Sequence, residues 1–367
     1  MNRIIGFDLA RAWAIFGMFI VNFNTVFGSH NVTTGLGGFL NLFNGNSSST
    51  FVILAGMGVA LMTNRSEYSD LEKSQLRRKV IRRSWFLFGL GLLLYIWWPA
   101  DILHFYGGYM HLAALLLFVP KRLYLWAAAG AIIIFHALLA VVPYETGWNF
   151  ETLTYTDFWT VPGFLRNTLY NGWNPIFPWL AYFLLGMWLG RLDWQQRRVR
   201  AWVFGTGAVV FALVEGVQAL AGMPAPAYRY HRQNLFSPDL TFYLTADYLP
   251  PFLPFMLGTA SFVLMLLVVC LEIGDRFAGS KWLTALIRTG QMTLTHYVVH
   301  LTLGMLILWG LTGHAYTGTL NETTPESPGL VLGFALVFYV FSVVFSVLWS
   351  CRFQHGPLET LMRKVAG

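Results

Sequence analysis

Charged residues are scarce in this chain: Asp, Glu, Lys and Arg together make up 11% of its 367 residues, whereas hydrophobic residues make up 56%. So few charges cannot cover the surface of a water-soluble domain of this length. A hydrocarbon core about 30 Å thick needs about 20 apolar residues per helix, and the chain offers many such runs. We therefore expect an all-α fold, a polytopic transmembrane helical bundle in a lipid bilayer.

Cysteine is also scarce, and both cysteines, Cys270 and Cys351, lie inside apolar runs. This pattern argues against a disulfide framework or a Cys-ligated metal site, and we expect both residues to serve in packing. The sequence lacks a P-loop, a G-x-S-x-G elbow, an H-E-x-x-H helix and a selectivity-filter motif. It therefore gives no support to an ATP-driven pump, and we expect neither a metal nor a tightly bound cofactor.

The lengths of the apolar runs, their flanking charges and Gly/Pro punctuation predict about ten spans. They lie near residues 9–28, 50–63, 84–98, 107–120, 123–143, 175–191, 201–221, 249–272, 290–312 and 327–350. The stretch from Gly35 to Ser49, rich in Gly, Asn and Ser, is a candidate for a segment that enters the membrane partway inside a protein-lined cavity. We treat residues 1–367 as a single transmembrane domain.

The distribution of Lys and Arg predicts the topology, because cytoplasmic loops retain these residues. Of the 24 Lys and Arg residues, an N-in start leaves only Arg166, Arg229 and Arg232 outside the cytoplasmic segments. This predicts an N-in/C-in orientation. It also explains the net charge of +7 without a nucleic-acid partner, since the basic residues cluster at the ends of apolar runs. The long outer loops, 144–174, 222–248 and 313–326, are expected to lie at the interface or to roof a cavity.

The first span carries several polar candidates. Asp8 and Arg11 are three residues apart, so they share a helix face and either pair as an anchor or bind substrate. Asn22 and Asn24 lie deep enough to need partners, either a carbonyl group in a polar cavity or another helix. His30 follows where the span emerges, and histidine suits general-base chemistry near neutral pH, although an interfacial histidine can also be structural.

Two further clusters lie near the middle and the end of the chain. Asp101 and His104 are three residues apart before Tyr106, so a helix would place them on one face for proton relay or metal binding. A capped helix start explains Asp101 equally well. His296 and His300 share a face inside a later span, and intramembrane ionisable residues are functional candidates by default. The alternative is neutral histidines that hydrogen-bond between helices.

Short motifs occur in the same order along the chain as in a known family. They are Gly6-Phe-Asp8-Leu-Ala-Arg11, Val21-Asn22, Asp101-Ile-Leu-His104-x-Tyr106-Gly107, Phe177-Pro-Trp-Leu-x-x-Phe-Leu-Leu-Gly186, Gly290-x-Met-x-Leu-Thr-x-Tyr297 and Gly356-Pro357-Leu-Glu359. With them the chain resembles the YeiB family of bacterial membrane proteins, which belongs with heparan-α-glucosaminide N-acetyltransferase in a superfamily of transmembrane acyltransferases. The resemblance to the acetyltransferase covers about residues 1–200, and the YeiB-type half covers about 200–367.

The resemblance implies an enzyme of the bacterial cytoplasmic membrane. It would move an acyl group, acetyl in the simplest case, from cytosolic acyl-CoA as co-substrate to an envelope glycan or a small polar acceptor reached from the other face. By position, Asn22 matches an amide that contacts the thioester, His30 falls three residues short of the catalytic histidine, and His300 matches the histidine of a Tyr-x-x-His segment. His104 is a further catalytic candidate. The candidate substrate-binding residues are Asp8, Arg11, Asp101, Tyr106, His296 and Tyr297.

Physical requirements are consistent with this interpretation. The acceptor needs a base, the thioester carbonyl needs a donor, and the CoA phosphates need cations, which the cytoplasmic Lys/Arg clusters can supply. The rival hypothesis is a transporter, exporter or flippase in which His296, His300 and Glu215 form a proton-coupling path. A noncatalytic sensor or immunity-type protein is a third hypothesis. A homodimer is compatible with all three.

Overall fold

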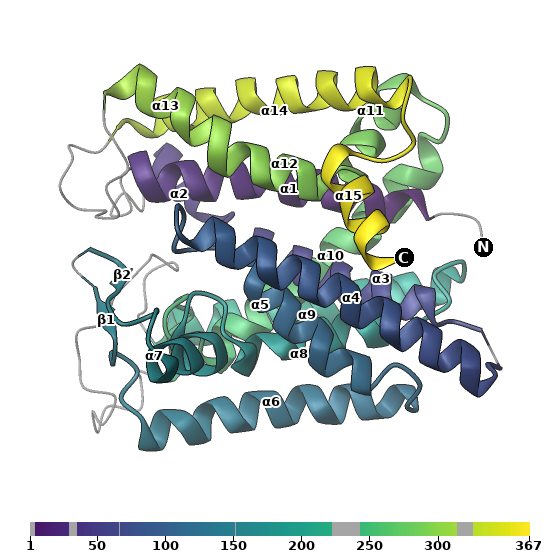
Figure 1. Cartoon of the computed structure of the whole chain (residues 1–367), viewed down its shortest axis with the longest axis horizontal. Helices are drawn as coiled ribbons and strands as arrows, with labels where there is room; N and C mark the ends of the chain where they lie inside the picture. Colours follow the sequence, from purple (N-terminus) through teal and green to yellow (C-terminus); the bar gives the residue numbers. More distant parts are fainter. Residues whose placement is uncertain (1–3, 29–34, 66, 151, 222–242, 314–325) are drawn as a thin grey trace. The chain divides into compact units, whose positions relative to one another are not determined.

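The structure, a computed structural model, describes residues 4–28, 35–65, 67–150, 152–221, 243–313 and 326–367. Its α-helices are α1 (Ile5–Phe27), α2 (Gly35–Asn41), α3 (Asn46–Met62), α4 (Asp70–Tyr95), α5 (Leu103–Leu115), α6 (Lys121–Val141), α7 (Val161–Arg166), α8 (Ile176–Leu189), α9 (Arg197–Leu220), α10 (Leu253–Arg276), α11 (Lys281–Gly290), α12 (Thr293–Val299), α13 (Met305–Thr312), α14 (Pro328–Ser350) and α15 (Pro357–Ala366) (Figure 1). Two π-helical turns, η1 (Asn167–Asn171) and η3 (His300–Gly304), and one hairpin of β1 (Trp148–Asn149) with β2 (Thr154–Tyr155) complete it. The helical class predicted from the sequence is confirmed.

The chain forms two compact units. Unit 1 takes its described residues from Met1–Phe51, Trp194–Tyr230 and Asp239–Thr360, and thus holds α1, α2 and α9 to α14. Unit 2 takes its described residues from Val52–Asp193 and Leu361–Gly367, and thus holds α4 to α8.

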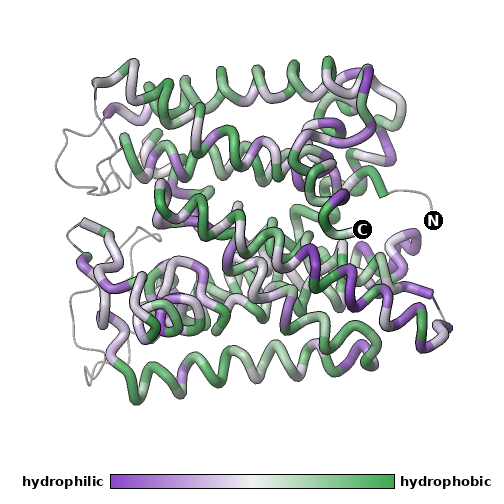
Figure 2. The backbone as a smooth tube through the Cα atoms, viewed as in Figure 1, coloured by the Kyte–Doolittle hydropathy of each residue, from purple (hydrophilic) through white to green (hydrophobic). Residues whose placement is uncertain are grey.

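Seven segments among the described residues are long and apolar enough to cross a membrane. They are Ile5–Phe27, Gly35–Met62, Lys121–Val141, Arg197–Leu220, Leu253–Arg276, Thr293–Thr312 and Pro328–Ser350. The other predicted spans fall on the second half of α4, on α5 and on α8, which is apolar but has only 14 residues. A multi-pass membrane protein is therefore supported, whereas ten spans and the N-in/C-in orientation stay predictions. Along α14 and α6 the chain is hydrophobic almost throughout (Figure 2).

Helix α4 differs from these spans because its first half is hydrophilic (Figure 2). It begins at a capping box in which Ser69 and Glu72 satisfy each other's backbone N–H groups. The helix then continues without a break into the apolar segment predicted near 84–98. Several cations of the basic segment between Arg65 and Arg83 therefore stand on one rigid helix.

Helix α1 is the central helix of unit 1, and it is buried on nearly every face. It packs against α10, α11, α12 and α14. Gly290 permits the contact with α11, because a Cβ atom there would overlap the Asp8 carbonyl oxygen. Polar residues of α1 consequently face other helices.

In unit 2, glycines bring α3 and α8 into backbone contact. A Cβ atom on Gly56 would overlap the carbonyl oxygen of Phe183, and one on Gly186 would overlap that of Ile53. Small residues allow this approach between helices in membrane proteins. The Gly186 motif of the sequence is therefore explained by packing.

The two cysteines differ in environment. Cys270 is buried in α10, as expected, whereas Cys351 is exposed. The prediction that Cys351 serves in packing is wrong, because α14 ends at Ser350 and the next residue lies on the surface.

Segment 144–174, which the sequence predicts to be an outer loop and which is therefore named the outer segment, contains the hairpin, α7 and η1. Asn171 organises it: its amide donates to the carbonyls of Tyr144 and Thr146 at 2.7 and 2.9 Å, and its oxygen accepts from the Tyr155 hydroxyl at 2.7 Å. Burial raises the pKa of Tyr155 to about 12. Arg166 adds a bond to Tyr155 at 2.8 Å and an ion pair with Asp157 at 2.7 Å.

Removing this arginine should loosen the outer segment. We expect Arg166→Gln to lower the free energy of unfolding by about 1–2 kcal/mol, because several charge-assisted bonds are lost while solvent screens the partly exposed Asp157. Thermal unfolding of the detergent-purified protein measures the effect. Arg198→Gln, a charge removal at an exposed position in the first turn of α9, is the control. Equal melting curves for the two variants would contradict the prediction.

Candidate active site

Two polar residues that the sequence places in separate apolar runs meet inside unit 1. Asn22 lies in the last part of α1, and His300 begins the π-helical turn η3 between α12 and α13. Asn22 Nδ2 is 2.8 Å from His300 Nε2, although the residues are 278 positions apart. Both are buried, with exposed fractions of 7% and 0%. π-Turns within helices are frequent at functional sites.

The neighbours of His300 determine its tautomer. His300 Nδ1 lies 3.1 Å from the carbonyl oxygen of His296, which can only accept, so Nδ1 carries the hydrogen. Nε2 then has a lone pair that accepts from the Asn22 amide. An amide nitrogen has two hydrogens, and His300 engages one of them. The second hydrogen of Asn22 Nδ2 can therefore bind another acceptor, such as a carbonyl oxygen.

His296 lies one turn before His300 and is held by α14. Ser346 Oγ donates its hydrogen to a carbonyl of its own helix at 2.8 Å, so it accepts from His296 Nε2 at 2.7 Å. The ring centroids of Phe19 and Tyr297 lie 4.9 and 5.3 Å from that of His300. Thus α14 holds His296 and α1 holds His300, and aromatic rings contact His300. The sequence did not single out Ser346, because a serine in an apolar helix carries no signal of its own.

Another histidine lies in unit 2, at the start of α5. His104 Nδ1 is 3.1 Å from Asp101 Oδ2, which also accepts from the His104 backbone N–H at 3.0 Å. Both side chains are fully buried. Because a carboxylate accepts, Nδ1 carries the hydrogen, and Nε2 keeps its lone pair with no partner among the described residues. A carboxylate orients a histidine base in this way.

The metal alternative for this cluster gains no support from the described residues. His111, seven residues after His104, bonds to Ser84 instead. Nowhere in the described part of the chain do three His, Cys, Asp or Glu side chains gather as a metal site would require. The pair of Asp101 and His104 therefore stands as a hydrogen-bonded dyad.

Asp8 and Arg11, the candidate substrate-binding residues near the N-terminus, pair with each other. Arg11 Nη1 lies 2.7 Å from Asp8 Oδ1, and Asp8 is 1% exposed. Gln291 Nε2 donates to the other carboxylate oxygen of Asp8 at 3.4 Å, which joins α1 to α11.

Tyr106 is buried in unit 2, and Tyr297 is buried beside His300 in unit 1. His30 lies outside the described residues.

Glu215, the acidic member of the predicted proton path, lies elsewhere in unit 1. It is exposed and borders a cavity of about 200 Å³ whose lining includes Asn41, Asn44 and Asn46. In the described part of the chain, no hydrogen bond connects Glu215 with His296 or His300. The structure therefore supplies no continuous path of these three groups.

The C-terminal helix fixes the start of α12, a contact that the sequence did not predict. Glu359 Oε1 accepts from the backbone N–H groups of Leu294 and Thr295 at 2.8 and 3.1 Å, and Oε2 accepts from the Thr295 hydroxyl at 2.6 Å. Leu358 N in turn donates to that hydroxyl at 3.1 Å. The Gly356-Pro357-Leu-Glu359 motif was the available signal, and it marks the residue that secures α12, which carries His296 and leads into His300.

Two family models match the chain. A model of the heparan-α-glucosaminide N-acetyltransferase catalytic domain matches residues 3–231, more than half of the chain, and a model described as a protein of unknown function (DUF418) matches residues 187–367. No curated protein matches the chain. Asn22 and His104 fall in the first match and His300 in the second, so the Asn22–His300 bond joins both parts. The chain belongs to the family of the heparan-α-glucosaminide N-acetyltransferase catalytic domain.

Proposed function

We propose that this protein is a membrane-bound acyltransferase. It transfers an acyl group, acetyl in the simplest case, from cytosolic acyl-CoA to a glycan of the cell envelope or a small polar acceptor reached from outside or from the membrane. The bacterial cytoplasmic membrane is the proposed location. The observation that carries the proposal is the Asn22–His300 pair in a chain of this family, because it presents a fixed amide hydrogen inside an apolar bundle.

Negative charge develops on the carbonyl oxygen of the thioester when the acceptor attacks it. A preorganised donor in a water-poor site stabilises that charge. Asn22 Nδ2 has one hydrogen for this role while His300 holds the other, so the amide does not need to reorient during the reaction. His300 thus acts as a positioning residue, because both of its ring nitrogens are already hydrogen-bonded.

Two histidines are candidates for the base that takes the proton from the acceptor. His30 is favoured by its position in the family pattern. His104 is favoured by its geometry, since Asp101 orients it and its Nε2 atom is free of partners among the described residues. Separate His30→Gln and His104→Gln variants distinguish them, because only loss of the base lowers turnover without lowering acyl-CoA affinity.

Acetyl-CoA binding and hydrolysis by the detergent-purified protein test the proposal. We expect a saturable rise in melting temperature with acetyl-CoA and slow release of the CoA thiol, with water as the acceptor. A folded protein that neither binds nor hydrolyses acetyl-CoA contradicts the proposal. Proton-coupled uptake by the same preparation in sealed vesicles would then support the transporter hypothesis.

The Asp101–His104 dyad gives a sharper prediction. In Asp101→Asn the amide can donate to His104 Nδ1, which moves the ring hydrogen to Nε2 and removes the free lone pair. If His104 is the base, turnover should fall about 10²-fold, the lower end of what a positioned base contributes. The same Oδ2 atom accepts from the His104 backbone N–H, so an amide nitrogen in its place also removes that bond, and thermal unfolding must show that the variant is folded. Unchanged hydrolysis by this variant would leave His30 as the base.

A further inference from the structure

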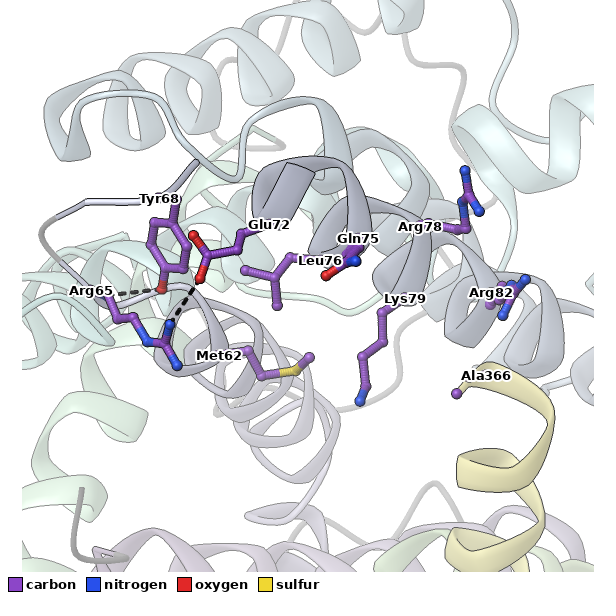
Figure 3. Close-up of a pocket in the computed structure, with 11 residues that line it drawn as sticks. Met62, Arg65, Tyr68, Glu72, Gln75, Leu76, Arg78, Lys79, Arg82 and Ala366 are labelled. Atoms are coloured by element: carbon purple, nitrogen blue, oxygen red, sulfur yellow. Dashed lines mark hydrogen bonds and ion pairs between the residues drawn. The ribbon is translucent and has the colours of Figure 1, made fainter. Parts of the chain in front are cut away.

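A cavity of about 530 Å³ lies in unit 2 beside the first turns of α4. Met62 at the end of α3, Tyr68 in the connecting segment and the terminal residues Ala366 and Gly367 form its other walls (Figure 3). Gln75, Lys79 and Arg82 line it from α4 at spacings of four and three residues, which places them on one helix face. Figure 3 shows Lys79 extending from α4 into the space between Met62 and Ala366.

The charges around this cavity are unbalanced. Its lining contains the cations Arg65, Arg78, Lys79 and Arg82 but one carboxylate, Glu72. That carboxylate is already engaged, since Oε1 accepts from Arg65 at 3.1 Å and Oε2 accepts from the Ser69 backbone and hydroxyl.

The remaining three cations form no ion pair in the described part of the chain. No described carboxylate lies within ion-pair distance of Arg78, Lys79 or Arg82. Burial, with repulsion from Arg83 and Arg363 of the same unit, lowers the pKa of Lys79. Like charges gathered around a partly enclosed space are unfavourable unless an anion joins them. The cavity therefore has an excess of positive charge that a bound anion would neutralise.

We propose that this cavity binds the phosphate groups of a ligand that carries more than one phosphate charge. The four side-chain cations and the Glu72 carboxylate leave a net side-chain charge of +3 in the lining, or +2 when the α-carboxylate of Gly367 is counted, and a phosphomonoester carries about −1.5 to −2. Arginine offers paired N–H donors that match phosphate oxygens, and Lys79 adds a mobile point charge. The site thus matches the charge of a phosphate group better than that of a single carboxylate.

Two sources offer this chemistry. One is the phosphorylated nucleotide end of acyl-CoA, and this source rests on the proposed function. The other is the headgroup of an anionic phospholipid. The experiment compares wild type with the double variant Lys79→Gln/Arg82→Gln in nanodiscs of phosphatidylcholine. Lys73→Gln is the matched control, because Lys73 stands on the same helix but pairs with Asp70 and does not line the cavity.

Calorimetric titration with coenzyme A and 3′-dephospho-coenzyme A is the first arm. We expect the double variant to bind coenzyme A about 10- to 100-fold more weakly than wild type or the control, as loss of charge-assisted hydrogen bonds predicts. If the cavity holds the 3′-phosphate, removing that phosphate should weaken binding to wild type but not to the double variant. This result supports the nucleotide source.

Nanodiscs that contain cardiolipin, which carries two phosphates, form the second arm. Stabilisation of wild type by cardiolipin that the double variant loses, with coenzyme A binding unchanged, supports the same site with a lipid source. If neither ligand distinguishes the double variant from the control, the proposal is overturned. If wild type hydrolyses acetyl-CoA, and the variants bind it equally well and respond equally to cardiolipin, the site alone is overturned. A wild type without coenzyme A affinity contradicts the proposed function and leaves the lipid arm to decide the site.

Discussion

Replacement of Asn22 by alanine is expected to lower the turnover number for acetyl-CoA hydrolysis about 10²- to 10³-fold. This is the range for removal of one donor from an oxyanion-binding site. The reason is geometric, since His300 engages one Nδ2 hydrogen and leaves the other at a fixed place inside unit 1. Release of the CoA thiol measures the rate, and thermal unfolding shows whether the variant is folded.

Asn24→Ala is the matched control, because it removes the same amide from the same helix at a position that does not contact His300 in the structure. We expect it to retain most of the turnover. His300→Ala should resemble Asn22→Ala, and the double variant should be no slower than either, since residues that act as a unit are not additive. Additive losses, or full activity of Asn22→Ala in a folded protein, would show that the pair only joins helices.

The sequence marked the members of this pair but not the pairing. Asn22 and His300 each stood out as polar residues inside apolar runs. Nothing local indicates that positions 278 apart meet, because the contact depends on how α1, α12 and η3 pack. The dyad was more accessible to prediction: Asp101 and His104 are three residues apart, and the helix start alone brings them together.

Hydropathy was sufficient to predict a helical membrane protein, but it predicted the bounds and the order of single elements less well. In α4 it marks only the apolar half, whereas the capping box at Ser69 starts the helix well before. In the outer segment 144–174, order comes from bonds such as that between Asn171 and Tyr144, 27 residues apart, which no local pattern reveals. A local side-chain cap sets the first outcome, and long-range hydrogen bonds set the second.

Loss of the Glu359 carboxylate should detach the C-terminal helix from the start of α12. We expect Glu359→Ala to lower the free energy of unfolding by about 2–4 kcal/mol, because the N–H groups of Leu294 and Thr295 lose their acceptor. Since α12 carries His296 and leads into His300, turnover should fall as well. Thermal unfolding and acetyl-CoA hydrolysis report the two effects.

Because Glu359 can ionise, this contact should depend on pH, unlike a helix cap without a titratable group. Burial raises the pKa of Glu359, so the folded state holds the proton more tightly than the unfolded state. The free energy of unfolding contributed by this group should therefore fall as pH rises from the ordinary glutamate pKa of about 4.3 to the raised value, and stay constant above it. Glu359→Gln keeps an oxygen for both N–H groups but cannot ionise. It should resemble wild type at low pH and be the more stable protein at neutral pH, and equal pH dependence of the two would refute this account.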